Sequence, residues 1–212
     1  MRIISTVLLS ILLFGGCKDG DFKGFTMGQV KTVNGVPIAN AEIHILYPDL
    51  EKDQTKSKPS AVISFLIPQT GQTTLDIHRF GTSILIEKLV ESELPAGKHS
   101  ATLSESLYTN GVYEYDLSAP NLNLSKRIFV LRPESELLNG VEPLATSNNS
   151  GNFTFQTSVL GIGEKFNSNH ASQSVIVPSK IEFIAIKETE IIARKTVRIS
   201  NGIDNEISLI VN

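Results

Sequence analysis

Apolar and polar residues alternate along most of the chain after residue 25. Every second position is apolar in four short segments, at Ile63/Phe65/Ile67, Leu75/Ile77, Ile84/Ile86 and Tyr113/Tyr115/Leu117. In the last segment, Glu114 and Asp116 occupy the intervening positions. A period of two is typical of strands that bury one face, whereas helical periods are scarce here. Further strands are expected at residues 28–33, 41–46, 127–131, 152–156, 180–187, 191–199 and 206–211.

Turn residues separate these segments at short intervals. Asn34-Gly35 is typical of a tight hairpin turn, and it predicts that strand 28–33 pairs with strand 41–46. Other turns are expected at Gly71, Gly81, Pro95-Ala96-Gly97, Asn110-Gly111, Ser150-Gly151 and Asn201-Gly202. About a dozen short strands at this spacing predict an all-β fold built from β-sandwiches.

The amino terminus has a different pattern. Arg2 is followed by a mostly apolar run over residues 3–14, and Gly15-Gly16-Cys17 comes next. Twelve residues of helix rise about 18 Å, far less than the roughly 30 Å of a bilayer's hydrocarbon core. We therefore interpret residues 1–16 as an export signal peptide, with cleavage between Gly16 and Cys17.

Cys17 is the only cysteine in the chain. The segment Leu13-Phe14-Gly15-Gly16-Cys17 resembles the lipobox of bacterial lipoproteins, with Phe14 at a position where leucine is usual. The resemblance implies that diacylglycerol is attached to the Cys17 sulfur and that a fatty acid such as palmitate acylates its new amino group. The alternative is a secreted protein with an incidental unpaired cysteine.

Residues 17–25 are expected to be a tether to the membrane. Lys18 occupies the position where aspartate retains some Gram-negative lipoproteins in the inner membrane, so the outer membrane is the expected location. The run Lys18-Asp19-Gly20-Asp21 also resembles the surface-export signals of Bacteroidota-type lipoproteins. A solvated tether without such a signal is the alternative.

Composition excludes some classes of partner and disfavours others. The 212 residues are 41% hydrophobic and 19% charged, a globular balance, and the net charge is −3. Removal of the signal peptide takes away Arg2 and leaves the mature chain near −4. A nucleic-acid partner is not expected, because such proteins carry a basic domain or stripe. The absence of Trp weakens a carbohydrate-stacking role without excluding one.

The first expected strands carry a family resemblance. Gly28-x-Val30 followed by Asn34-Gly35-x-Pro37-Ile38-x-Asn40-Ala41-x-Ile43-x-Ile45 resembles the opening of carboxypeptidase regulatory-like domains. The family's next element, a T-D-x-x-G-x-F turn, has its nearest match in Ser147–Phe153, about a hundred residues further along. The resemblance implies a transthyretin-like sandwich made of residues 26–47 and 126–212. It also implies a non-catalytic accessory role.

The intervening residues 58–118 resemble a second family. Ile63-x-Phe65-x-Ile67-Pro68-x-x-Gly71, Leu94-Pro95-Ala96-Gly97-x-His99 and Asn110-Gly111-Val112-Tyr113 resemble the Ig-like domain of flagellar hook-capping proteins and the sorting domains of type IX secretion cargo. His78-Arg79 replaces the usual aromatic-Asp pair. The interpretation is a small Ig-like sandwich inserted in a loop of the first sandwich. Three consecutive β-units are the alternative, and the internal position argues against a sorting tag.

Motifs that carry chemistry are not found. The four histidines, His44, His78, His99 and His170, form neither a HExxH pattern nor a close cluster with other metal ligands. No GxSxG elbow is present, Gly161-Ile162-Gly163-Glu164 is interpreted as a bend, and no calcium loop follows Asp19 and Asp21. We therefore expect no catalytic residues, no metal and no cofactor, and the chain is not expected to be an enzyme.

The expected function is structural or adhesive contact at the bacterial envelope. The membrane is bound through the lipid anchor, and the partners are expected to be envelope proteins or surface glycans. Contact surfaces are expected at loops 49–60, 119–125 and 164–179, the last containing the polar run 167–174. The alternative is a lipoprotein that captures a glycan or peptide for an envelope uptake system. A hydrolase would require titratable residues that converge in a pocket.

Overall fold

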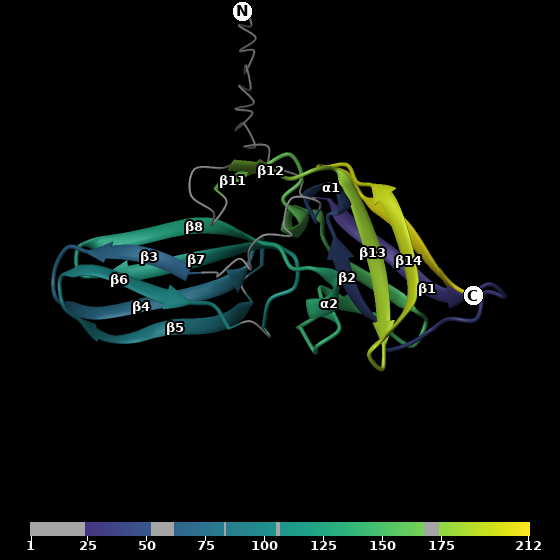
Figure 1. The fold of residues 1–212 in the computed structure, drawn as a ribbon, viewed down its shortest axis with the longest axis horizontal. Helices are drawn as coiled ribbons and strands as arrows, with labels where there is room; N and C mark the ends of the chain where they lie inside the picture. The colour runs from purple at the N-terminus through teal and green to yellow at the C-terminus, as the bar shows by residue number, and fades with distance from the viewer. Residues whose placement is uncertain (1–23, 52–61, 83, 105–106, 168–173) are drawn as a thin grey trace, which may run out of the picture.

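Extended strands joined by turns build almost all of the described structure (Figure 1). The computed structural model describes residues 24–51, 62–82, 84–104, 107–167 and 174–212. Its strands are β1 (Phe25–Thr32), β2 (Glu42–Leu46), β3 (Val62–Ile67), β4 (Gly71–Arg79), β5 (Leu85–Leu94), β6 (Gly97–Thr102), β7 (Gly111–Ala119), β8 (Leu122–Val130), β9 (Ala145–Thr146), β10 (Asn152–Gln156), β11 (Lys165–Asn167), β12 (Ser174–Ile176), β13 (Lys180–Lys187), β14 (Glu190–Arg198) and β15 (Asn205–Val211). Short helices are α1 (Pro48–Glu51), α2 (Glu134–Leu137) and the 3-10 turn η2 (Thr157–Leu160). The predicted all-β fold is confirmed.

Two sheets made from the two ends of the chain enclose the larger core. One sheet has the order β10-β1-β15, in which β1 runs antiparallel to β10 and parallel to β15. The other has the order β14-β13-β2-β9. Side chains from both sheets meet between them, among them Val30, Ile43, Phe153, Phe183 and Leu209. Burying these apolar surfaces is the main stabilising contribution to this part of the chain.

The predicted pairing of strand 28–33 with strand 41–46 is wrong. The Asn34-Gly35 turn forms, since the Gly35 amide donates to the Thr32 carbonyl at 2.9 Å, but β1 and β2 lie in different sheets. The chain folds back on β1 for only a few residues, where the Ile38 amide donates to the Val30 carbonyl at 2.9 Å. It then bonds to Ser147, whose Oγ donates to the Ile38 carbonyl at 2.8 Å and accepts from the Ala41 amide at 2.9 Å. These bonds turn the chain away from β1.

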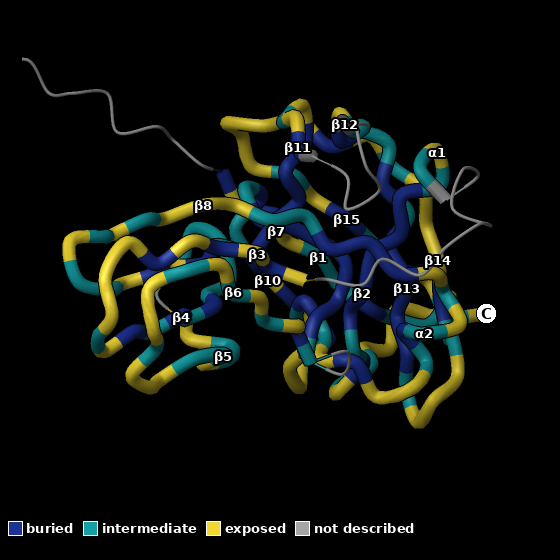
Figure 2. The backbone as a smooth tube through the Cα atoms, turned by 60° about the vertical axis from the view of Figure 1, so that its left-hand side comes forward, coloured by how far each residue is buried: buried dark blue, intermediate teal, exposed yellow. Residues whose placement is uncertain are grey.

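The burial pattern of β2 explains why it lies inside a sheet. Ile43 and Ile45 face the large core, whereas Leu46 faces a smaller core with Ile184 and Leu137 on the opposite side. A strand covered on both faces needs layers on both sides, and α2 and the segment after it provide the second layer. Most residues of β2 and β13 are buried, as the colouring of Figure 2 shows.

A second pair of sheets is formed by β3 to β8. The orders are β3-β6 and β5-β4-β7-β8, and neighbouring strands are antiparallel. Their core contains Phe65, Ile67, Leu75, Ile77 and Leu117, and alternation along β3, β4 and β7 puts these residues on inward faces. The strands predicted from period-two alternation at 63–67, 75–77 and 113–117 are therefore confirmed.

Strand pairing connects β3 to β8 only with one another, among the residues that the structure describes. This sheet system continues to Val130, beyond residue 118, because β8 pairs with β7 along its whole length. The division into an interrupted carboxypeptidase regulatory-like unit (26–47 and 126–212) and an inserted Ig-like unit (58–118) stays a prediction. In the part of the chain with described coordinates, no helix is long and apolar enough to cross a bilayer.

Each of the three predicted contact loops contains some regular structure in its described residues. Residues 119–125 form a tight turn at Pro120-Asn121, where Asn121 has φ 59°, and then the start of β8. Residues 164–179 contain the β11–β12 hairpin around the undescribed positions 168–173. Loop 49–60 starts in α1, and its residues 52–60 lie outside the described structure. Local backbone pairing accounts for these differences, because polar strand residues at a sheet edge look like loop residues in the sequence.

Candidate functional site

The predicted lipid attachment site, Cys17, lies outside the described residues, together with Gly16 and the tether up to residue 23. The first described residue, Gly24, is held firmly. Its carbonyl accepts a hydrogen bond from the Thr157 amide at 3.1 Å, and the next amide, of Phe25, donates to Asp204 Oδ1 at 2.8 Å. Gly24 has φ 59°, and a Cβ there would lie 2.2 Å from the Ile203 carbonyl oxygen. The body therefore begins at a fixed point beside η2 and the turn before β15.

The histidines do not come together. His44 is buried in β2, and His78 in β4 lies 3.5 Å from Asp116 of the neighbouring β7. His99 in β6 stacks on Phe65 with ring centroids 5.7 Å apart, and its Nε2 lies 2.9 Å from the Pro95 carbonyl. His170 lies outside the described residues. No group of three or more His, Cys, Asp or Glu side chains that could hold a metal occurs among the described residues.

His44 is a neutral group in the interior. Its Nδ1 lies 3.0 Å from the Thr109 hydroxyl, which is also fully buried, and its Nε2 has no hydrogen-bond partner. Burial penalises the charged ring and lowers the pKa of His44 to about 4. Glu42 lies 3.8 Å from Nε2 but is half exposed, so a charged pair does not form at neutral pH. The arrangement links β2 to the segment before β7.

A buried asparagine connects the two sheet systems. Asn110 is fully buried, and its amide nitrogen donates to the carbonyls of Ile45 at 2.8 Å and Arg132 at 3.1 Å. Its side-chain oxygen accepts from the Arg132 amide. One side chain thereby satisfies three backbone groups that come from β2 and from the segment after β8. Asn110-Gly111 was predicted as a turn, and the bend is present, but the side chain points inward.

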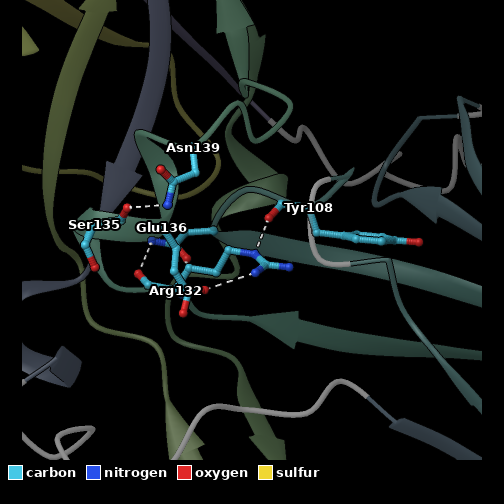
Figure 3. Close-up of polar contacts among 6 residues, drawn as sticks. Tyr108, Arg132, Ser135, Glu136 and Asn139 are labelled. Carbon is cyan, nitrogen blue, oxygen red and sulfur yellow. Dashed lines mark hydrogen bonds and ion pairs between the residues drawn. The ribbon is translucent and has the colours of Figure 1, made fainter. Parts of the chain in front are cut away.

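Arg132 extends this network toward α2, as Figure 3 shows. Its Nε donates to the Tyr108 carbonyl at 2.6 Å, and its Nη1 lies 3.1 Å from Glu136 Oε2. Arg79 acts similarly from β4, donating to the carbonyls of Leu144 at 2.6 Å and Pro143 at 3.1 Å. Both guanidinium groups thus bind backbone oxygens at the junction between the sheet systems, and neither is directed at an open cavity.

The carboxylate of Glu87 in β5 accepts hydrogen bonds from neighbouring hydroxyl and amide groups. It accepts from the Tyr108 hydroxyl at 2.6 Å, from the Ser104 amide at 3.1 Å and from the Ser104 hydroxyl. Burial and the bond to Glu87 raise the pKa of Tyr108, and burial raises that of Tyr113 to about 12. These bonds hold Ser104 and Tyr108 against β5.

The described surface contains several hollows. One of about 730 Å³ is an open groove over β1, β10 and β15, with residues of β9 on one wall; Met27, Gln29, Ala145, Asn148 and Glu206 are among its lining residues. A second, about 520 Å³, lies over β3 and β6 and is lined by residues 64–66 and 98–100. A third, about 400 Å³, lies between β3, β8 and β11, and Lys126, Arg127 and Lys165 are among its lining residues. Arg127 is paired with Glu164 and also lies over the Phe80 ring, 4.8 Å from its centroid. None of these three hollows contains an aligned acid, base and nucleophile.

Strand β3 is an uncharged strand at the edge of its sheet. Its residues, Val62-Ile63-Ser64-Phe65-Leu66-Ile67, carry no charge, and β6 is the only described strand that hydrogen-bonds to it. Ile63, Phe65 and Ile67 face the core, whereas Leu66 is 61% exposed. The other edges of this unit are different, because β5 carries Glu87, Lys88, Glu91 and Glu93 and β8 carries Lys126 and Arg127. Charged residues normally prevent edge strands from pairing with other chains.

Sequence reasoning missed both the Asn110 network and the β3 edge. The edge had a signal, since a six-residue run rich in β-branched and aromatic residues without charge is typical of strands that pair readily. The Asn110 network has no such signal in the sequence, because the residues that Asn110 bonds, Ile45 and Arg132, are far from it along the chain.

No family model matches the chain, and no curated protein or solved structure matches it.

Proposed function

We propose that this chain is a lipid-anchored protein of the bacterial envelope, attached through Cys17 to the outer membrane, whose β-sandwich body makes structural or adhesive contacts and catalyses no reaction. The body would project from the anchor and bind an envelope protein or a neighbouring surface component. The observation that carries the proposal of contact is the free, uncharged edge of β3.

Strand addition is the mode of contact that this edge supports. An added strand would satisfy the outward amides and carbonyls of β3 and continue the β3-β6 sheet. Leu66 and Ser64 alternate on the exposed face, so a partner with alternating side chains could pack on them. Phe65 and Ile67 keep β3 attached to its own core, which makes the edge a rigid template.

The test compares charge placed on two edge strands. Leu66→Lys puts a charge on the exposed face of β3, and Thr196→Lys places the same charge at an exposed position of the edge strand β14. Both changes are made in the Cys17→Ala protein, which carries no lipid to insert into a membrane, and binding of the purified proteins to envelope vesicles from the source bacterium is measured by co-sedimentation. We expect Leu66→Lys to weaken binding about tenfold or more, a change of roughly 1.4 kcal/mol, and Thr196→Lys to leave it unchanged. Equal binding by both variants would contradict strand addition at β3.

Lipid attachment is tested separately. Wild-type protein is expected in the outer-membrane fraction, labelled by radioactive palmitate, and Cys17→Ala is expected to lose the label and to leave that fraction. A Cys17→Ala protein that remains membrane-bound after normal processing would refute the anchor.

Capture of an extended peptide or glycan is a second candidate function, favoured by the open groove of about 730 Å³ over β1 and β10. Phe25 is the only aromatic side chain among the large exposed hydrophobic residues described, so an aromatic platform for sugar rings is not present in this part of the chain. Saturable binding of peptides or oligosaccharides to the protein, abolished by Thr154→Arg in the groove, would favour capture over adhesion.

A further inference from the structure

We infer that the end of the body where β1 begins rests on the lipid surface, with the side chains of Phe25, Met27 and Ile203 in contact with it. We call these three residues the proximal cluster. The inference rests on the proposed anchor at Cys17, and it adds which face of the body meets the bilayer.

The proximal cluster is exposed and apolar. Phe25 is 46% exposed, Met27 36% and Ile203 54%. Phe25 and Met27 share the outward face of β1, because residues two apart on a strand point the same way. Ile203 is close to them, since the Gly24 backbone packs on the Ile203 carbonyl and the Phe25 amide bonds to Asp204. Three apolar side chains therefore surround the point where the body begins.

The length of chain before this point keeps it near the bilayer. Six residues lie between Cys17 and Gly24, so seven residue steps separate the two. Seven steps would span about 25 Å fully extended, and about 15 Å as a random coil. Gly24 is fixed by its bond to Thr157, so the lipid anchor holds this end of the body within that distance. For aromatic and aliphatic side chains held at this distance, the transfer from water to the boundary between headgroups and acyl chains lowers the free energy.

A comparable apolar group lies at the other end of β1. Val33 and Val36 in the turn after β1 are exposed, and so is Ile210, which pairs in register with Lys31. β1 is eight residues long, so these residues lie about 26 Å further along the strand. Figure 1 shows β1 running from the middle of the molecule toward the carboxyl terminus. Because the short segment after Cys17 holds only the Gly24 end of β1 near the bilayer, we expect the proximal cluster, and not the group at the far end, to contact lipid. Val36, at the far end, therefore serves as the matched control position.

The chain has no tryptophan, so a single introduced one reports its own surroundings. Two full-length acylated variants, Phe25→Trp and Val36→Trp, are reconstituted into phosphatidylcholine vesicles whose acyl chains carry bromine, a short-range quencher. Flotation with the vesicles is measured first. Both variants are compared with the same proteins in vesicles without bromine, and equal thermal unfolding midpoints to the wild type verify the fold.

We expect both variants to float, the fluorescence of Phe25→Trp to fall at least about twofold with a shift to shorter wavelength, and that of Val36→Trp to stay unchanged. If both variants float and Phe25→Trp is not quenched, or Val36→Trp is quenched as strongly, the orientation is refuted and the anchor stands. If neither variant floats, the anchor itself is refuted, and the orientation with it.

Discussion

His44 provides a direct test of the buried junction between the sheet systems. Its ring is fully buried against Thr109, and burial lowers its pKa from 6.5 to about 4. In the unfolded chain the same ring has its ordinary pKa, near 6.5. Between these two values the unfolded chain binds a proton that the folded protein does not. The free energy of unfolding should therefore fall as the pH falls from about 6.5 toward 4, and this contribution should be complete above pH 6.5.

The magnitude follows from the difference between the two pKa values. The full difference corresponds to roughly 3 kcal/mol, and about 2 kcal/mol of it should be lost by pH 5. That loss is a large fraction of a typical folding free energy of 5–15 kcal/mol. Carboxylates titrate in the same range, so the contribution of His44 must be isolated by a substitution that removes its titration.

Urea unfolding of the acylated protein in a nonionic detergent, followed by circular dichroism at pH 7.5 and at pH 5, provides the measurement. His44→Gln retains a polar side chain but binds no proton, so it should lose about 2 kcal/mol less than the wild type between these pH values. Thr196→Gln changes an exposed residue that does not titrate and should keep the wild-type loss. A His44→Gln protein whose pH dependence matches the wild type within about 0.5 kcal/mol would refute a depressed pKa at this position.

Two further substitutions test particular contacts. Asn110→Ala removes three buried hydrogen bonds and should destabilise the protein by about 3 kcal/mol in urea unfolding, whereas Asn139→Ala, which removes one exposed bond, should change stability by less than about 0.5 kcal/mol. Similar losses for the two would show that Asn110 does not hold the junction. Gly28→Ala would place a Cβ 2.2 Å from the Phe153 ring and 2.7 Å from the Ile207 carbonyl oxygen, so its melting temperature should fall, with a cost of about 1–3 kcal/mol from displacing both. An unchanged melting temperature would contradict this close packing of β1 against Phe153 and β15.

Strand positions were predictable because burial along a strand follows a local rule. Tyr113, Tyr115 and Leu117 are buried in β7 while Asp116 is exposed, as their alternation predicts. The partners of each strand were not predictable in the same way. β1 pairs with β15, about 180 residues away, and nothing in the Asn34-Gly35 turn distinguishes this arrangement from a hairpin with β2.

Polar residues were harder to interpret than apolar ones. Asn110 and His44 look in the sequence like a turn residue and a strand-rim residue, yet both are buried and bonded to groups from other parts of the chain. The value of a hydrogen bond to a side chain depends on whether its partner is buried too, and that is known only when the sheets are assembled.

The sequence by itself determined the strand-forming segments and the all-β class, because apolar alternation and turn residues act over a few positions. It also defines the proposed anchor, since the apolar run, the two glycines and the single cysteine are adjacent. Only the tertiary structure decided that β1 and β2 lie in separate sheets, that Asn110 joins β2 to the β3–β8 strands, and that the uncharged β3 is an edge. These features depend on which distant segments become neighbours. Alternation with a period of two predicts where strands form but not which strands pair.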